Sequence, residues 1–75
     1  MDEIEKSVFL LRMFTRESDE SMRDVINSLA NTGMFSVKEG RRIRRELESD
    51  GYISDGELTL KGIAEAQKAQ EEFRL

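Results

Sequence analysis

The sequence predicts a mainly α-helical fold with one small β-hairpin, and three observations support this prediction. Apolar residues recur at helical spacing in several stretches of the chain. Ser36 and Glu39 have the spacing of a capping box at the start of a helix. Asp55 and Gly56 separate two short segments of strand-like composition and favour a two-residue hairpin turn. The expected order is three helices, two strands and a fourth helix.

The first helix is expected at residues 3–16, with an apolar stripe toward the core. This stripe consists of Ile4, Val8, Leu10, Leu11 and Phe14. Phe9 and Met13 fall outside the stripe at about 100° per residue. Either the helix is central and buried on two sides, or Phe9 and Met13 face a partner.

The second helix is expected to follow Ser18 or Asp19, either of which can cap it, and to end before Gly33. Its inward face is predicted to consist of Met22, Val25, Ile26 and Leu29.

The third helix, residues 36–49, is predicted to turn Val37, Gly40, Ile43 and Leu47 inward. A glycine inside a helix costs about 1 kcal/mol relative to alanine, so Gly40 indicates close packing on another helix.

Residues 52–54 and 57–60 are predicted as the two strands, and the final helix as starting at Lys61. The apolar positions of the final helix are Ile63, Ala66, Ala69 and Phe73.

Residues 43–62 resemble the segment from recognition helix to wing of winged helix-turn-helix regulators, in the PadR-like and MarR-like branches. There a leucine-rich helix end runs into E-x-D-G-x-I, and the wing closes with L-T-x-K-G. The matching residues here are Leu47, Glu48, Asp50, Gly51, Ile53, Leu58, Thr59, Lys61 and Gly62. The resemblance extends over residues 18–73. It implies a winged-helix fold more specifically than a function, because most of these residues are packing and turn residues.

The chain of 75 residues is expected to form one domain over residues 1–75. It contains neither Cys nor His, which excludes a disulfide and a nitrogen–sulfur metal site. No apolar run could span a bilayer, and the acidic start does not resemble a signal peptide, so a cytoplasmic protein is expected. We expect no cofactor, no metal and no small-molecule ligand.

Catalysis is not expected. Without His or Cys, the Ser-His-Asp and Cys-His arrangements cannot form. The five glycines fit no phosphate-cradling motif, and the paired carboxylates near the ends are interpreted as solvated faces.

The basic residues of the third helix are the candidate binding site. Residues 37–45 carry a net charge of +4, whereas the rest of the chain sums to −8. The cations are Lys38, Arg41, Arg42, Arg44 and Arg45. All except Arg44 share one face, opposite the inward residues, and this face could enter the major groove of DNA. Arg44, on the flank, suits phosphate, and Arg41 or Arg42, nearer the helix start, is expected to read a base. The alternative is a solvated face with intrahelical ion pairs, such as Arg42 with Glu46 and Arg44 with Glu48.

Two functions follow from these observations. The first is a small DNA-binding transcription regulator that reads the major groove of double-stranded DNA with residues 36–49. The second is a protein–protein interaction module on the same fold, with Arg41, Arg42 and Arg45 against an acidic partner. The predicted wing tip argues against phosphate contact by the wing, because Asp55 and Glu57 would repel phosphate. Either DNA contact depends on the third helix alone, or the chain binds protein.

A homodimer is expected through the first and last helices, since two-fold dimers suit inverted half-sites. The predicted interface consists of Phe9, Met13, Ala66, Ala69 and Phe73.

Overall fold

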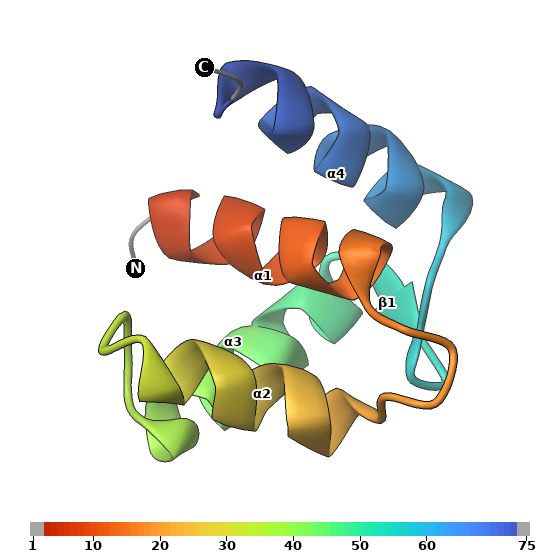
Figure 1. Cartoon of the computed structure of the whole chain (residues 1–75). Helices are drawn as coiled ribbons and strands as arrows, with labels where there is room; N and C mark the ends of the chain where they lie inside the picture. The colour runs from red at the N-terminus through yellow and green to blue at the C-terminus, as the bar shows by residue number, and fades with distance from the viewer. Residues whose placement is uncertain (1–2, 74–75) are drawn as a thin grey trace.

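The computed structural model describes residues 3–73, which form four helices and one antiparallel hairpin (Figure 1). In chain order the elements are α1 (Glu3–Thr15), α2 (Met22–Asn31), α3 (Val37–Ser49), β1 (Ile53–Ser54), β2 (Glu57–Leu58) and α4 (Leu60–Glu72). The predicted mainly helical fold with a small hairpin is therefore confirmed.

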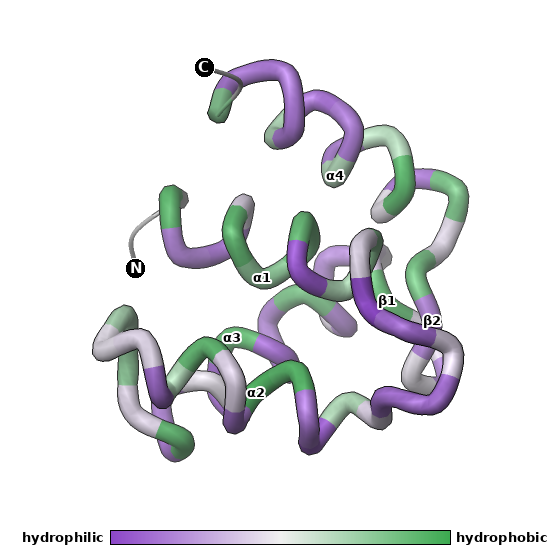
Figure 2. The backbone as a smooth tube through the Cα atoms, viewed as in Figure 1, coloured by the Kyte–Doolittle hydropathy of each residue, from purple (hydrophilic) through white to green (hydrophobic). Residues whose placement is uncertain are grey.

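Helix α1 lies between α4 on one side and α2 and α3 on the other (Figure 1). Its residues Phe9, Leu10 and Met13 are buried, and the Phe9 ring stacks on that of Phe35 with centroids 6.5 Å apart. Figure 2 shows how much of α1 is apolar. Of the two interpretations of Phe9 and Met13, burial of a central helix is the one that the structure shows.

The predicted inward stripe of α1 was wrong at its start. Ile4 is 57% exposed and Leu11 is only partly buried. The prediction holds for Leu10, which is buried, and for Val8 and Phe14, which pack partly buried against the core. The reason for the differences is that α1 has apolar residues on most of its circumference. Which apolar side chains of α1 reach the core is therefore decided by the positions of the three neighbouring helices and not by the spacing of residues within α1.

Helix α2 begins later than predicted, because Ser21 caps it rather than Ser18 or Asp19. The Ser21 hydroxyl accepts a hydrogen bond from the Asp24 backbone N–H, and the Asp24 carboxylate accepts one from the Ser21 backbone N–H. This reciprocal pair satisfies two backbone donors that would otherwise lack partners. The predicted inward residues Met22, Val25, Ile26 and Leu29 are all buried.

Helix α3 begins at the predicted capping box of Ser36 and Glu39. Gly40, Ile43 and Leu47 are buried, and Val37 is partly buried against the core. A Cβ at Gly40 would lie 2.8 Å from Ile26 Cγ2, so the expected close approach of another helix is confirmed.

The hairpin turn is confirmed, but its strands are shorter than predicted. Asp55 and Gly56 have φ of 53° and 78°, as a two-residue hairpin turn requires. The paired strands end at Ile53 and Leu58. One more backbone hydrogen bond joins the Thr59 N–H to the Tyr52 carbonyl at 3.0 Å, and the Thr59 side chain caps α4 by accepting a hydrogen bond from the Gly62 N–H. Leu60 is therefore the first residue of α4 rather than the end of a strand.

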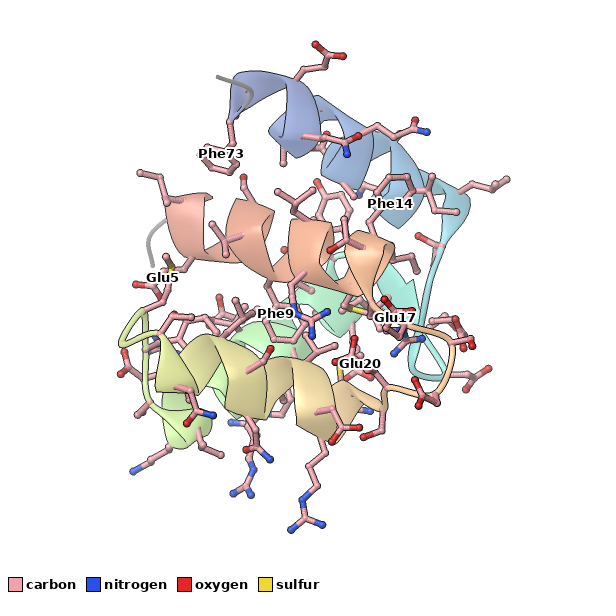
Figure 3. All side chains as sticks on the ribbon, in the orientation of Figure 1. Glu5, Phe9, Phe14, Glu17, Glu20 and Phe73 are labelled. Carbon is pink, nitrogen blue, oxygen red and sulfur yellow. The ribbon has the colours of Figure 1, made fainter. Side chains whose placement is uncertain are left out.

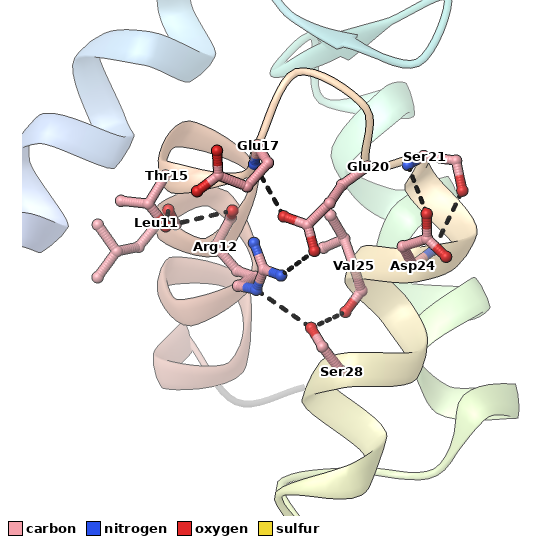
Figure 4. A network of polar contacts seen from close by, with 9 residues as sticks. All are labelled: Leu11, Arg12, Thr15, Glu17, Glu20, Ser21, Asp24, Val25 and Ser28. Carbon is pink, nitrogen blue, oxygen red and sulfur yellow. Dashed lines mark hydrogen bonds and ion pairs between the residues drawn. The ribbon is translucent and has the colours of Figure 1, made fainter.

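The Arg12 side chain ties α1 to α2 and to the loop between them (Figure 4). Its guanidinium donates to Glu20 Oε2 at 2.6 Å and to the Ser28 hydroxyl at 3.1 Å. The other Glu20 oxygen accepts from the Glu17 backbone N–H at 2.8 Å. The bond from Arg12, followed by that from Glu17, lowers the pKa of Glu20 below its ordinary value.

Candidate nucleic-acid interface

The core contacts of α3 fix which of its side chains face outward. With Gly40, Ile43 and Leu47 buried, the opposite side of the helix is left to solvent. The exposed cations on that side are Lys38, Arg41, Arg42 and Arg45. Arg44 is only partly exposed, on the flank of this surface. The predicted exposure of the basic face is thus confirmed.

Two of the five cations form the intrahelical ion pairs that the sequence suggested. Arg42 Nε lies 3.8 Å from Glu46, and Arg44 Nε lies 3.6 Å from Glu48. Within residues 3–73, Lys38, Arg41 and Arg45 form no ion pair or side-chain hydrogen bond. Three positive charges on α3 are therefore not neutralised inside the described part of the chain.

An open groove of about 470 Å³ runs between α2 and α3. Its lining residues are Arg23, Ile26 and Asn27 from α2, and Val37, Arg41, Arg44, Arg45 and Glu48 from α3. Four arginines and one glutamate give this lining a net charge of +3. The apolar part of the lining, Ile26 and Val37, also packs on the core.

Arg23 was not predicted from the sequence as a site residue. Arg23 and Asn27 are one helical turn apart on the exposed side of α2, between inward residues. That spacing is visible in the sequence, but only the crossing of α2 over α3 brings Arg23 to the arginines of α3. A single basic residue on a polar helix face carries no such information.

The tip of the hairpin is acidic and is attached to the chain just after α1. Asp55 and Glu57 are exposed. Arg16 donates to Glu57 Oε2 at 3.0 Å and to the Gly56 carbonyl at 3.2 Å. One of the two tip carboxylates is therefore paired with a cation.

The motif residues after α3 join the end of α3, the hairpin and the start of α4. The Thr59 hydroxyl donates to the Gly51 carbonyl at 2.7 Å. Lys61 donates to the Asp50 carbonyl at 2.8 Å, and its ammonium lies 4.4 Å from the centre of the Tyr52 ring. These contacts give Lys61 a structural role, as expected for packing and turn residues.

Four of the five predicted dimer-interface residues are not available to a partner. Phe9 and Met13 are 0% and 3% exposed, and Ala66 and Ala69 are 0% and 2% exposed. They were misassigned because both helices bury these residues against the chain's own core. Phe73, at 42% exposed, is the one of the five that offers surface. It lies at the end of α4, over the start of α1 (Figure 3).

Residues 3–73 contain no cluster of three or more acidic, His or Cys side chains placed to hold a metal ion. In the same part of the chain, none of the helices has the length and apolar character needed to cross a membrane.

Comparison of the chain with protein-family models, with curated proteins and with solved structures finds no match.

Proposed function

We propose that this chain is a winged helix-turn-helix protein that binds double-stranded DNA through the outward face of α3 and regulates transcription. The observation that carries the proposal is the basic face itself. Five cations lie on or beside the exposed side of a helix whose other side is buried, in a chain with net charge −4. A compact positive element on a negative body suits a phosphate backbone.

The arrangement of the elements supports the same proposal. Helices α2 and α3 are joined by a short turn at Gly33, whose φ is 82°, and the hairpin follows α3 directly. The major groove admits an α-helix, and the exposed side of the second helix of such a pair is the one that contacts bases. Arginine can hold guanine O6 and N7 with two hydrogen bonds, or clamp phosphate.

The test is a titration of the pure protein against random-sequence duplex DNA at two salt concentrations. We expect binding that weakens steeply with salt, and weaker binding after Arg41→Glu or Arg45→Glu. The matched control is Lys68→Glu, since Lys68 is exposed on α4, across α1 from α3 (Figure 1). Absence of duplex binding by the wild-type protein at low salt would contradict the proposal.

A second candidate function is a protein–protein interaction module whose α3 arginines meet an acidic partner. The acidic tip of the hairpin favours it, because Asp55 forms no ion pair within residues 3–73 and would repel a phosphate backbone brought near it. The charge of Glu57 is offset by Arg16. Salt-dependent binding of an acidic polypeptide, without binding of duplex DNA, would support this candidate in place of the first.

A further inference from the structure

We infer that the groove between α2 and α3 holds phosphodiester groups of the DNA backbone, with Arg23 of α2 as a phosphate contact outside the basic cluster of α3. This inference rests on the proposed function and deepens it. It assigns a role to a residue on a different helix and divides the roles of the α3 cations.

Three of the four arginines that line the groove have no partner within residues 3–73. Arg23, Arg41 and Arg45 are exposed and form no ion pair or side-chain hydrogen bond within residues 3–73. Arg44 lies 3.6 Å from Glu48, and its buried Nε has no hydrogen-bond partner there. The carboxylate of Glu48 would repel a bound anion, but its negative charge is offset by the neighbouring guanidinium of Arg44. The groove thus has unused donors and an excess of positive charge.

The shape of the groove and the chemistry of its donors indicate the occupant. A guanidinium presents its donors as a planar fork that matches two phosphate oxygens. Arg23 lies on α2, whereas Arg41 and Arg45 lie on α3, so cations border the groove on two sides. An open groove with charge on both sides suits a chain that passes through it. One strand of duplex DNA provides such a chain, with one charge about every 3.4 Å along the axis.

A division of roles follows on α3. Arg41 and Arg45 line the groove, whereas Lys38 and Arg42 do not. We therefore assign Arg23, Arg41 and Arg45 to phosphate, and leave Lys38 and Arg42 to face the base edges. This narrows the expected base reader from Arg41 or Arg42 to Arg42.

The test is the salt dependence of duplex binding by the full chain, for wild type and Arg23→Gln. Each lost phosphate contact should flatten the slope of log affinity against log salt by about 0.9, which is roughly eightfold weaker binding at 0.1 M salt. The loss should be the same on every duplex sequence. Lys68→Gln, which removes one exposed positive charge from α4, should behave as wild type. Arg42→Gln should instead change the preference among sequences.

Each outcome that contradicts the inference leads to a different conclusion. If wild type binds duplex and Arg23→Gln binds with the same affinity and slope, the inference is overturned and the proposed function stands. If wild type does not bind duplex, both are overturned, and Arg23-dependent binding of poly-glutamate would then reassign the groove to an acidic polypeptide. A saturable response of the Arg23 amide resonance to inorganic phosphate alone, at constant ionic strength, would reassign it to a small phosphate ligand.

Discussion

Arg16 and Glu57 are 41 residues apart in sequence, and their side chains meet at 3.0 Å. The same Arg16 nitrogen donates to the Gly56 carbonyl, so one guanidinium holds both the side chain and the backbone of the hairpin tip. The Arg16 side chain is 16% exposed, whereas that of Glu57 is 77% exposed. The hairpin is thereby fixed to the segment after α1.

This asymmetry predicts unequal effects of removing the two partners. Glu57→Gln should lower the free energy of unfolding by less than about 1 kcal/mol, because exposed ion pairs contribute little. Arg16→Gln should lower it by about 1–2 kcal/mol, since the Gly56 carbonyl then loses its donor and apolar contacts of the arginine stem are lost as well. Urea unfolding of both variants at neutral pH measures the difference. Equal effects would show that the ion pair alone, and not the backbone contact, anchors the tip.

The hairpin and α3 could be predicted from the sequence because their determinants are local. The capping residues Ser36 and Glu39 and the turn residues Asp55 and Gly56 act within three or four positions of one another. Residues that interact in these two elements are near neighbours in the sequence, so no knowledge of the tertiary structure is needed to identify them. The exposure of the α3 cations was also predicted correctly, because they lie opposite the inward face of α3, which was itself predicted correctly.

The environment of α1 could not be predicted in the same way. Apolar residues cover most of its surface, so several orientations bury a similar amount of apolar area. The choice of Phe9 and Met13 over Ile4 depends on where α2, α3 and α4 lie. The groove between α2 and α3 could not be predicted from the sequence either, because Arg23 lies near the α3 cations only where the two helices cross.

Gly62 is predicted to be the less replaceable of the two helical glycines. A Cβ there would lie 2.1 Å from the Tyr52 carbonyl oxygen, and backbone cannot rotate away. At Gly40 the nearest atoms belong to the side chains of Ile26 and Phe35, at 2.8 and 2.9 Å. Gly62→Ala should therefore lower the free energy of unfolding by about 1–3 kcal/mol or more.

Gly40→Ala is the matched comparison. It should have a smaller effect, because side chains can shift and alanine gains about 1 kcal/mol of helix propensity. Chemical denaturation with a circular-dichroism readout measures both variants. A greater loss at Gly40 than at Gly62 would contradict this ranking.

Self-association stays a prediction, and its contact is now expected at Phe73 rather than at the four buried residues. Phe73 borders a groove of about 490 Å³ that also includes Leu11 and Thr15 of α1. A second copy bound here would leave the outward face of α3 free, since α3 lies across α1 from α4 (Figure 1). Phe73→Glu should convert a dimer to a monomer in sedimentation at tens of micromolar.

Leu60→Glu is the control for self-association, because Leu60 is 87% exposed at the other end of α4. It adds the same charge and should leave the sedimentation behaviour unchanged. A monomeric wild-type protein, or a dimer that Phe73→Glu does not weaken, would remove the prediction.

The contact between Arg12 and Glu20 predicts a dependence of stability on pH. The pKa of Glu20 is lowered in the folded chain, first by the hydrogen bond from Arg12 and then by the one from the Glu17 N–H. The folded state therefore favours the ionised carboxylate more than the unfolded state does. The resulting stabilisation is complete above the ordinary carboxyl pKa of 4.5 and is lost as pH falls through the lowered folded value.

Glu20→Gln isolates this contribution. At pH 7 the variant should melt below wild type, because Arg12 loses its ionic partner. The gap between the two melting temperatures should close as the pH falls below 4.5 toward and past the lowered pKa of Glu20, since wild type then becomes protonated at the same position. Glu72→Gln, at an exposed site on the last turn of α4, should show no such closing gap. A difference in melting temperature between wild type and Glu20→Gln that stays constant from neutral to acid pH would contradict this prediction. It would show that the contact between α1 and the following loop does not depend on ionisation of the Glu20 carboxylate.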